Sequence, residues 1–401
     1  MSQPVQKLRT QVAIVGAGPA GLTLARLLSV AGIDSVVLET RSREYVEARV
    51  RAGVLEQGSV DLLTEAGVGT RLREEGIVHC GIYLQFDGER HQIPLSELAD
   101  GRSIVIYGQT EVVKDLIADR LAEGRPLHFD VYDTSVHGFE TPTPIVRFSR
   151  GGAKFELQCD VIAGCDGFHG VCRQTVADRL DIFTREYTYG WLGILAAVAP
   201  SSDELVYSNH ERGFALLSLR SPEISRLYIE CAADDDLRNW PDDRIWEELQ
   251  VRLGVDGWSL AEGPVLEKGI TGMRCSVAEP MRVGRLFLAG DAAHIVPPTG
   301  AKGLNLALAD VAVLSEALRS WYESRSETGM NEYSSNCLGR IWRAEHFSSW
   351  MTSMLHRGDR DPFAHRLQLS ELRYVTSSPA AARALAENYV GLPIEHFAPV
   401  G

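Results

Sequence analysis

The sequence lacks any run of about 18 apolar residues and any N-terminal stretch with the charge and length pattern of a signal peptide. We therefore expect neither membrane spanning nor export. It also lacks a C-x-x-C motif, and its seven cysteines are scattered at Cys80, Cys159, Cys165, Cys172, Cys231, Cys275 and Cys337. An odd, unpatterned set predicts reduced thiols in a cytoplasmic protein and argues against a disulfide framework or a zinc site.

An excess of positive charge is also absent, because 54 acidic side chains outnumber 40 basic ones and give a net charge of −14. This balance argues against nucleic acid or an anionic membrane as the main partner. Repeats and low-complexity segments are absent as well. The remaining composition is that of a globular protein: 45% of the 401 residues are apolar, enough to bury a large core in two or three domains.

The first chemical motif lies in residues 11–39, whose pattern predicts strand, tight turn, helix and strand. A β-branched run leads into Gly16-x-Gly18-x-x-Gly21, and the second strand ends in Glu39. Gly16 would allow the tight turn, Gly18 would let backbone approach a pyrophosphate, and Gly21 would let the helix pack against the strand. The helix N-terminus would stabilise phosphate charge, and Glu39 could bond a ribose hydroxyl. The pattern predicts a dinucleotide site, and the alternative is a glycine-rich turn in another α/β domain.

Two later strands end in the same way, at Asp166 in AGCDG and at Asp291 in AGDAAH. Ligands of a doubly wound sheet bind at the carboxyl ends of the strands, so both carboxylates would face one crevice. The alternative at each position is a turn residue or a helix N-cap. A second dinucleotide fingerprint is absent, which favours one tightly held dinucleotide and a transient reductant. The glycine motif alone does not choose between FAD and NAD(P).

These motifs together resemble those of the single-component FAD-dependent aromatic hydroxylases. The general motifs are GAGPAG, GCDGFHG and AGDAAH, and the more specific ones are RVRAGVLEQGSVDLL, YGQTEV, AGDAAHIVPPTGAKGLNLA, WMTSMLHR and AENYVGLP. The likeness runs in order from about Thr10 to Pro393 and is most specific to members that act on 4-hydroxybenzoate. It implies a non-covalently bound FAD, reduction by NADPH or NADH, and O₂ as co-substrate. The product would be 3,4-dihydroxybenzoate, formed through a flavin hydroperoxide, and the enzyme would be a homodimer.

The strand and helix pattern and the resemblance together imply an α/β fold with three regions. A Rossmann-like FAD-binding domain of the glutathione-reductase type would span residues 1–180, with residues 275–300 completing it. A substrate-binding β-sheet domain would span residues 181–274. A C-terminal helical interface region would span residues 301–401.

A candidate hairpin for binding a carboxylate spans residues 213–230, where apolar and polar residues alternate. Ser218 and Arg220 are two residues apart, so a strand would place both on one face. A turn centred on Glu223 would place Arg220 opposite Arg226. Two arginines that face each other across strands repel unless an anion lies between them.

The same register would place Ser218 opposite Tyr228. An arginine grips a carboxylate through two parallel hydrogen bonds, and the two hydroxyl groups would add donors. The resemblance implies that Ser218, Arg220 and Tyr228 bind the substrate carboxylate. The alternative is a solvated, charged strand face.

A phenol substrate needs a route for its proton, because a free phenol titrates near pH ~10 and electrophilic hydroxylation needs an electron-rich ring. The resemblance implies that Tyr207 and Tyr389 contact the phenol and pass its proton toward His79. A histidine has a pKa suited to accept that proton near neutral pH. The resemblance also puts the carbonyl of Pro298 beside the substrate. Without the resemblance, both tyrosines and His79 would be interpreted as packing residues.

Residues 301–323 have the spacing of an amphipathic helix, so most of its apolar face is core. The free N–H groups and the dipole at its start would favour negative charge, such as that of a reduced flavin. The resemblance implies that Lys302, Leu304 and Asn305 lie beside the flavin, and that Asp291 holds the ribityl chain.

Several basic side chains follow Glu39, and in an acidic protein they are better placed to meet phosphates than solvent alone. The resemblance implies that Arg51 and Gln109 contact FAD. It gives the NAD(P)H contacts as Tyr45, Arg49, His169 and Arg274, and the chain departs from the family pattern at Thr40 and Arg41. Arg41 and Arg43 could hold a 2′-phosphate, which favours NADPH and leaves NADH as the alternative.

Two alternatives to a 4-hydroxybenzoate hydroxylase follow from the same residues. One is the same chemistry on another hydroxybenzoate, and the other is a flavin-binding sensor without catalysis. The carboxylate-binding set and the tyrosine pair favour a para-hydroxylated benzoate, and their retention argues against the sensor.

Overall fold

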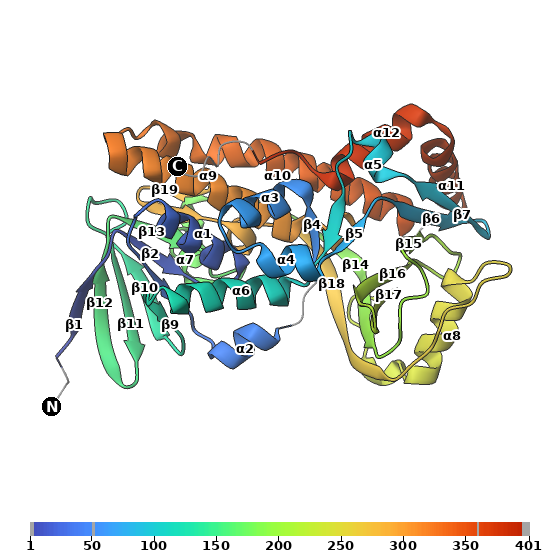
Figure 1. Ribbon diagram of the computed structural model, residues 1–401, viewed down its shortest axis with the longest axis horizontal. Helices are drawn as coiled ribbons and strands as arrows, with labels where there is room; N and C mark the ends of the chain where they lie inside the picture. The colour runs from blue at the N-terminus through green and yellow to red at the C-terminus, as the bar shows by residue number, and fades with distance from the viewer. Residues whose placement is uncertain (1–3, 50–52, 359–360, 395–401) are drawn as a thin grey trace.

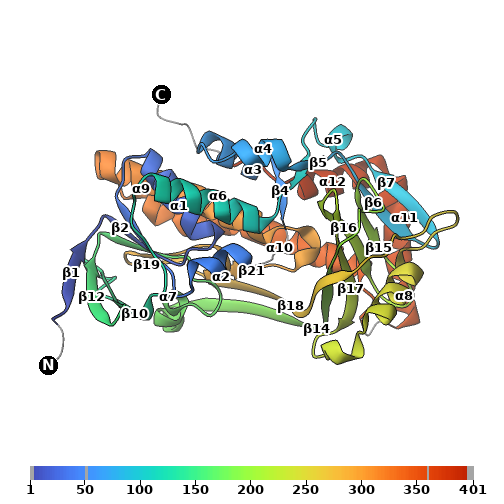
Figure 2. The same ribbon diagram turned by 60° about the horizontal axis from the view of Figure 1, so that its bottom comes forward.

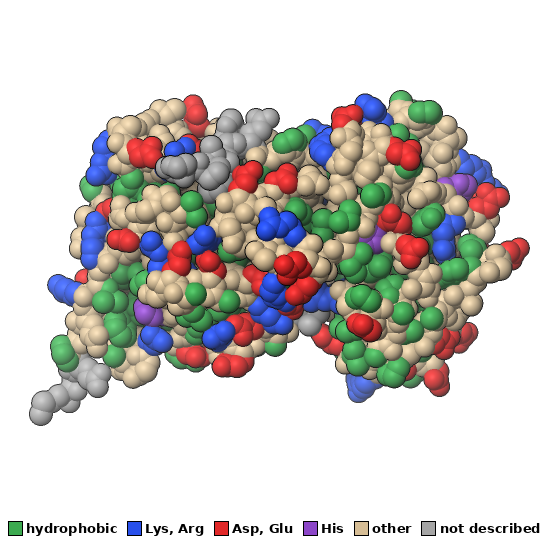
Figure 3. Space-filling view, in the orientation of Figure 1, with side chains coloured by type: hydrophobic (Ala, Val, Ile, Leu, Met, Phe, Trp, Pro, Cys, Tyr) green, Lys and Arg blue, Asp and Glu red, His purple; other side chains and the backbone are tan. Residues whose placement is uncertain are grey.

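The computed structural model describes residues 4–49, 53–358 and 361–394. Two sheets and the helices around them form one half of the molecule, and an eight-stranded sheet forms the other half (Figure 1). The predicted α/β fold is therefore confirmed. Acidic and basic side chains are interspersed over the face shown in Figure 3.

The dinucleotide motif lies in a six-stranded sheet of order β19-β20-β13-β2-β3-β9. In that order the strands are β19 (Arg282–Val283), β20 (Leu286–Leu288), β13 (Val161–Gly164), β2 (Val12–Val15), β3 (Ser35–Leu38) and β9 (Leu127–His128). Strands β20, β13, β2 and β3 are parallel, so their carboxyl ends meet at one edge. Helix α1 (Pro19–Val30) follows β2 and packs against α6 (Gln109–Ala122) and α9 (Gly303–Ser324). The strand, turn, helix and strand predicted for residues 11–39 are confirmed.

Two smaller sheets flank this one. The first has the order β1 (Gln6–Arg9), β12 (Ala153–Gln158), β11 (Ile145–Arg150) and β10 (Tyr132–His137). The second has the order β4 (Val54–Glu56), β8 (Ile104–Ile106) and β5 (Ile77–His79).

The eight-stranded sheet joins segments that lie far apart in the sequence. Its order is β21 (His294–Ile295), β18 (Val265–Glu279), β14 (Asp181–Ala196), β17 (Ile224–Ala232), β16 (Ala215–Ser221), β15 (Leu205–Ser208), β6 (Ile82–Phe86) and β7 (Glu89–Ile93). The long strands β14 and β18 run from one half of the molecule to the other (Figure 2).

The remaining helices surround these sheets. The longer ones are α8 (Asp242–Leu253), α10 (Thr328–Leu355), α11 (Pro362–Ser377) and α12 (Pro379–Val390). The shorter ones are α2 (Arg43–Ala48), α3 (Gln57–Glu65), α4 (Thr70–Glu75), α5 (Leu95–Leu98) and α7 (Val171–Thr175). Single 3₁₀ turns lie at Ala177–Arg179, Leu237–Asn239, Gly290–Ala292 (η3) and Pro298–Gly300 (η4). Within the described ranges, no helix is long and apolar enough to cross a lipid bilayer.

Alternating residues of the eight-stranded sheet form two separate apolar cores. Leu217 and Val206 belong to the core that includes residues of α8. Leu216, Tyr207 and Tyr228 belong to the core that includes residues of α10, α11 and α12. Since successive side chains of a strand point to opposite faces, this alternation decides which residues reach the functional site.

The structure agrees with one prediction about where an element lies and differs from another. The helix predicted over residues 301–323 is confirmed as α9. Residues 82–93, which the sequence places in the first region, instead form β6 and β7 of the eight-stranded sheet. The parallel pairing of β6 with β15 is a long-range contact, which local patterns in the sequence do not reveal.

Candidate functional site

The glycine loop after β2 has the backbone geometry that a dinucleotide requires. Gly16 has a φ of +107°, and a Cβ there would lie 2.2 Å from the carbonyl oxygen of Cys165. A Cβ on Gly21 would lie 2.0 Å from the carbonyl oxygen of Gly16. A Cβ on Gly18, by contrast, would meet no atom within 4 Å. Gly16 and Gly21 are therefore required by the fold, whereas Gly18 leaves open space for a ligand.

Glu39 is held at the edge of this loop. One carboxylate oxygen accepts a hydrogen bond from the backbone N–H of Ala17 at 2.8 Å, and the other accepts one from the backbone N–H of Arg41 at 2.8 Å. The adjacent cavity is lined by Ala17, Gly18, Pro19, Glu39, Arg41, Tyr45, Val46, Arg49, Gln109, Thr110 and Val113. Three residues predicted to bind FAD therefore line this cavity: Gly18, Glu39 and Gln109. Three residues predicted to contact NAD(P)H line it as well: Arg41, Tyr45 and Arg49. Arg51 lies outside the described residues.

The two aspartates after β13 and β20 have different surroundings. One oxygen of Asp166 accepts a hydrogen bond from the backbone N–H of Cys172 in α7, at 2.9 Å, and burial raises the pKa of Asp166. This is the helix-capping role that the sequence left open, and a cofactor contact for Asp166 stays a prediction. Asp291 is exposed on η3, where a Cβ on Gly290 would lie 3.3 Å from the Cβ of Ala20. Asp291 is therefore close to the start of α1.

A buried ion pair ties the start of α9 to the small three-stranded sheet. The Nζ atom of Lys302 lies 2.6 Å from a carboxylate oxygen of Glu56 and donates to the carbonyl of Tyr389 at 2.9 Å. The side chain of Asn305 accepts a hydrogen bond from the backbone N–H of Glu56 at 2.9 Å and donates to the carbonyl of Val54 at 3.0 Å. Burial lowers the pKa of Lys302, against the opposing effect of Glu56.

Glu56 was missed from the sequence, although it lies within RVRAGVLEQGSVDLL. The available signal was the position of Glu56 directly after the apolar pair Val54 and Leu55, in a motif that also contains the acidic residue Asp61. Leu304 lies with Asn305 in the first turn of α9, where backbone N–H groups have no acceptor within the helix. The predicted residues at the start of α9 are therefore brought together.

A second cavity lies against the eight-stranded sheet. It is lined by Gly53, Val54, Ile106, Trp191, Leu205, Tyr207, Leu216, Ser218, Leu219, Arg220, Arg226, Tyr228, Pro298 and Ala301. All five predicted substrate-binding residues (Tyr207, Ser218, Arg220, Tyr228 and Pro298) are in this set. The apolar lining residues Val54, Ile106 and Trp191 were not predicted, because they come from strands far apart in the sequence.

The predicted register of the β16–β17 hairpin is wrong. Ser218 pairs with Arg226, and Leu216 pairs with Tyr228, so the register differs by two residues from the one expected. One of these two residues comes from a register shift between Leu219 and Ser221, which leaves Arg220 without a Cα partner. The other comes from the turn, which centres between Pro222 and Glu223 and not on Glu223. The turn is correspondingly tight, since Ser221 pairs directly with Ile224.

Two arginines converge on this cavity despite the altered register. The Nε atom of Arg226 donates to the hydroxyl of Tyr228 at 2.5 Å. Arg220 lies against Gly108, where a Cβ would be 2.0 Å from a guanidinium nitrogen. Burial, and then the nearby charge of Arg226, lower the pKa of Arg220. Because no carboxylate within the described ranges forms an ion pair with Arg220, the cavity is suited to an anionic ligand.

A tyrosine pair lies on the same face of the sheet. The hydroxyl groups of Tyr207 and Tyr389 form a hydrogen bond, and both side chains are buried. Burial and the neighbouring Tyr389 raise the pKa of Tyr207 well above its ordinary value, so it stays a neutral phenol at physiological pH. Two buried hydroxyls in contact form a short path along which a proton can move. His79 is also buried but does not line the cavity.

The first turn of α6 lies between the two cavities. Gln109 lines the glycine-loop cavity, and the preceding Gly108 contacts Arg220 of the other cavity. Thr110 donates a hydrogen bond to the carbonyl of Arg49 at 3.1 Å. A displacement of this turn would therefore alter both cavities.

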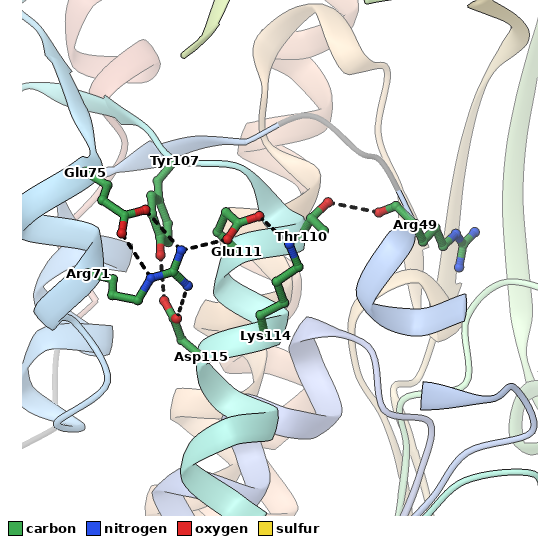
Figure 4. Close-up of polar contacts among 8 residues, drawn as sticks. All are labelled: Arg49, Arg71, Glu75, Tyr107, Thr110, Glu111, Lys114 and Asp115. Atoms are coloured by element: carbon green, nitrogen blue, oxygen red, sulfur yellow. Dashed lines mark hydrogen bonds and ion pairs between the residues drawn. The ribbon is translucent and has the colours of Figure 1, made fainter. Parts of the chain in front are cut away.

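A network of charged residues fixes α6 against α4, near the middle of the face in Figure 3 (Figure 4). Arg71 lies 3.0 Å from Glu75, 2.8 Å from Glu111 and 2.5 Å from Asp115. The hydroxyl of Tyr107 donates to Asp115 at 2.6 Å, and burial and this carboxylate raise the pKa of Tyr107. The network combines several charges in one geometry, which makes it more effective than an isolated surface pair.

Two predicted NAD(P)H residues belong to a different cluster, around Phe168. The guanidinium of Arg274 lies 4.8 Å from the ring centre of Phe168, and that of Arg173 lies 4.5 Å from it. The ring of His169 meets the same phenylalanine edge-on at 4.9 Å. His169 and Arg274 are thus brought together, but neither lines the cavity that holds Arg41, Tyr45 and Arg49. Phe168 was not predicted, although it lies in the quoted motif GCDGFHG.

A buried acid on α10, Glu345, was also not predicted from the sequence. Glu345 is 4% exposed, and neither carboxylate oxygen has a hydrogen-bond partner among the described residues. Burial raises the pKa of Glu345 to about 7, although the nearby Cys275 thiol, which lies outside normal hydrogen-bond geometry, and then His294 act in the opposite direction. Nothing local marks this position, because Glu345 follows Arg343 and stands directly before His346, as an exposed residue of a polar helix face would.

This pKa predicts that Glu345 makes stability depend on pH. Between about pH 4.5 and 7 the unfolded chain ionises at this position while the folded chain stays protonated, so stability falls as pH rises through this window. The loss reaches roughly 3 kcal/mol above pH 7. We expect Glu345→Gln to raise the melting temperature at pH 8 and to change it little at pH 4.5. Glu332→Gln, at an exposed position of the same helix, is the control. An equal effect of Glu345→Gln at both pH values would contradict the expectation.

The open space at Gly18 predicts a selective loss of cofactor binding. We expect Gly18→Ala to keep the fold, because its Cβ meets no protein atom, and to weaken FAD binding by about tenfold or more, or about 1.4 kcal/mol. The measurement is a fluorescence titration of the apoprotein with FAD. Gly269→Ala is the matched control, since its Cβ also meets no atom within 4 Å and lies on β18. Equal FAD affinity in the two variants would remove Gly18 from the cofactor site.

Comparisons with known proteins agree with this geometry. Residues 9–348 match the model of a family described as FAD binding domain. The p-hydroxybenzoate hydroxylase of Acinetobacter baylyi is 50% identical over 394 residues, which cover 98% of this chain and 97% of that protein. The 6-methylpretetramide 4-monooxygenase of Streptomyces rimosus is 26% identical and covers 79% of this chain and 78% of its own.

Among solved structures, p-nitrophenol 4-monooxygenase from Pseudomonas putida has the same fold, with a TM-score of 0.83 and 19% identity. The match covers 96% of this chain and 99% of that one. A family model that spans most of the sequence, and a relative of half-identical sequence over nearly its whole length, agree with the glycine loop and the adjoining cavity. The chain belongs to the FAD-dependent aromatic hydroxylases.

Proposed function

We propose that the protein hydroxylates 4-hydroxybenzoate to 3,4-dihydroxybenzoate, using NAD(P)H and O₂. The observation that carries the proposal is the composition of the second cavity. It combines Arg220 and Arg226 with the hydroxyls of Ser218 and Tyr228, and it also contains Tyr207. These groups match the two polar ends of a para-hydroxylated benzoate. The half-identical relative from Acinetobacter baylyi, named for this activity, supports the same substrate.

At one end of the substrate, Arg220 would bind the carboxylate. Its guanidinium is partly buried and has no carboxylate partner in the described part of the chain, so an incoming anion would meet little competition. Ser218 and Tyr228 would add hydroxyl donors to the same carboxylate. Binding there fixes the ring in one orientation, which is the protein's main contribution to positioning.

At the other end, the hydroxyl of Tyr207 would contact the phenol oxygen. A phenol with a pKa near ~10 must lose its proton to become electron-rich enough for electrophilic attack. The Tyr207 hydroxyl would accept a hydrogen bond from the phenol and pass the proton on to Tyr389, because the two tyrosine hydroxyls already form a hydrogen bond with each other. His79 would be the final acceptor, in keeping with the ordinary pKa of histidine.

The residues of the glycine loop and of the start of α9 fit an FAD molecule. Gly16 and Gly21 would shape the loop and Gly18 would admit the pyrophosphate, Glu39 would bind the ribose, and Gln109 and Arg51 would contact other parts of the nucleotide. Asp291, Lys302, Leu304 and Asn305 would hold the ribityl and flavin portions, where a buried cation and a helix N-terminus favour negative charge. Bound FAD, once reduced by NAD(P)H, supplies the activated oxygen. The protein's residues position the substrate, move its proton and exclude water.

Further parts of the proposal concern the reductant, assembly and location. Arg41 and Arg43 favour NADPH, with Tyr45, Arg49, His169 and Arg274 as additional contacts. The protein would act as a homodimer in the cytoplasm. The alternatives are the same reaction on another hydroxybenzoate, and a flavin-binding sensor that has no catalytic activity.

The proposal is tested with purified FAD-containing protein and a panel of substrates. NADPH and NADH oxidation are followed without a substrate, with 4-hydroxybenzoate, with 3-hydroxybenzoate and with benzoate. We expect 4-hydroxybenzoate to stimulate oxidation most and to be converted to 3,4-dihydroxybenzoate on chromatography. Conversion of only 3-hydroxybenzoate would favour the other substrate, and no conversion of any compound would favour the sensor.

A further inference from the structure

His79, at the end of β5, has two ring nitrogens in unlike surroundings. The side chain is 0% exposed, and its Nδ1 atom lies 2.5 Å from one carboxylate oxygen of Glu204. Its Nε2 atom is buried and has no hydrogen-bond partner among the described residues. One nitrogen is therefore fixed by a carboxylate, and the other is left available inside the protein.

The carboxylate of Glu204 is itself held in place. Its second oxygen accepts hydrogen bonds from the backbone N–H groups of Cys80 at 3.2 Å and Gly81 at 3.0 Å. Both donors lie directly after His79 in the chain. Glu204 therefore contacts three nitrogen atoms of one short segment, and two of them are backbone N–H donors to a single oxygen. An ionised carboxylate can only accept, so it would receive the third hydrogen bond from a His79 ring that carries its proton on Nδ1.

The fold connects this pair to the substrate cavity. Glu204 immediately precedes β15, which carries Tyr207, and β15 pairs with β6 just beyond Gly81. Strand β5 pairs with β8, which contributes Ile106 to the cavity lining. Burial first, and the negative charge of Glu204 as a further contribution, raise the pKa of Tyr389, while its hydrogen bond to Tyr207 acts in the opposite direction. Glu204, His79 and Tyr389 therefore belong to one electrostatic environment.

We propose that Glu204 is a positioning residue that holds the neutral His79 ring with its proton on Nδ1, so that Nε2 is the proton acceptor of the tyrosine path. The carboxylate also stabilises the imidazolium that forms when Nε2 takes the proton. Glu204 is the titratable group in contact with His79, Tyr389 is near enough to Glu204 for its pKa to respond to that carboxylate, and Cys80 beside His79 is exposed. This inference rests on the proposed hydroxylation, because it assigns the last step of that proton path.

The decisive variant is Glu204→Gln. An amide has a single carbonyl oxygen, and the backbone N–H groups of Cys80 and Gly81 require it as their acceptor. The NH₂ group then faces Nδ1 and forces that nitrogen to accept, which moves the ring proton to Nε2. The matched control is Asp203→Asn, which removes the same charge from an exposed neighbouring side chain. Glu204→Asp keeps the charge and tests rescue.

The first measurement is ¹⁵N NMR of histidine-labelled, FAD-containing protein without substrate, with His79 assigned by His79→Gln. We expect the Nδ1–H tautomer in the wild type, in Asp203→Asn and in Glu204→Asp, and the Nε2–H tautomer in Glu204→Gln. The second is stopped-flow absorbance of bound 4-hydroxybenzoate after a pH jump. Phenol deprotonation is expected to be at least about tenfold slower in Glu204→Gln alone.

The outcomes separate this inference from the proposed function. An Nε2–H tautomer in the wild type, or the same tautomer and the same deprotonation rate in Glu204→Gln, would overturn the role of Glu204. Absence of 3,4-dihydroxybenzoate from wild-type reactions would instead overturn the proposed function and would leave the tautomer result intact. If Glu204→Gln does not fold, the wild-type and Glu204→Asp spectra still decide the tautomer.

Discussion

Replacing Arg220 with lysine is expected to raise the dissociation constant for 4-hydroxybenzoate by about 100-fold, or about 2.7 kcal/mol. The guanidinium offers two parallel donors to a carboxylate, whereas an ammonium group is a single point charge that cannot reproduce this geometry. The partly buried position of Arg220 strengthens the effect, since a single ammonium group in the same cavity leaves the substrate carboxylate incompletely hydrogen-bonded. Equilibrium dialysis or a flavin absorbance titration with 4-hydroxybenzoate measures the change.

The matched control is Arg238→Lys, at a position 90% exposed whose guanidinium pairs with Asp236 and with no other carboxylate in the described part of the chain. It makes the same chemical change far from the substrate cavity, and we expect no change in the dissociation constant. FAD affinity should be equal in both variants. An unchanged dissociation constant in Arg220→Lys would remove this arginine from the carboxylate site.

The second large effect is expected for Tyr207→Phe. This change removes the hydroxyl that bonds to Tyr389 and that we propose contacts the phenol, but it keeps the ring that packs in the apolar core. Substrate binding should therefore change little, because the carboxylate contacts are intact. The yield of 3,4-dihydroxybenzoate per NAD(P)H should fall at least about tenfold, with the missing fraction appearing as hydrogen peroxide.

The control for this prediction is Tyr322→Phe, which removes a hydroxyl that bonds to Asp160 in the other half of the molecule. Its product yield should match that of the wild type. A wild-type yield in Tyr207→Phe would mean that the tyrosine path has no part in the reaction. A large loss of substrate affinity would mean that Tyr207 binds the substrate rather than moving its proton.

Local features of the sequence predicted local parts of the site well. The turn at Gly16, the close approach at Gly21 and the acid at the end of β3 all depend on contacts within about 25 residues or on backbone geometry. The amphipathic pattern of α9 is likewise a property of one segment. Such features can be recognised because a tight turn needs a glycine and an amphipathic helix needs apolar residues at a fixed spacing.

Contacts between distant segments could not be predicted in the same way. Glu56 and Lys302 are separated by 246 positions, and His79 and Glu204 by 125. No local pattern around one residue of such a pair indicates which residue it contacts. The predicted register of the β16–β17 hairpin was wrong by two residues, because the bulge at Arg220 and a turn centred before Glu223 each change the pairing by one residue. The predicted substrate-binding residues of β16 nevertheless line the cavity, because alternation along β16 survives the shift on each side of the bulge.

The site residues expected to contact NAD(P)H were the least predictable part. Arg41, Tyr45 and Arg49 line the cavity of the glycine loop, and His169 and Arg274 gather around Phe168 instead. Exposed side chains of this kind have no packing requirement that fixes their role. The structure separates them into two groups that the sequence had combined.

The most direct test of the proposed function is the molar ratio of 3,4-dihydroxybenzoate formed to NAD(P)H consumed by the purified FAD-containing protein in air-saturated buffer with 4-hydroxybenzoate. The cavity described above predicts a ratio close to unity, because the carboxylate contacts and the tyrosine pair place the ring and remove its proton together. A ratio near zero, with all NAD(P)H consumption recovered as hydrogen peroxide, would contradict the central claim that this cavity is built to hydroxylate 4-hydroxybenzoate.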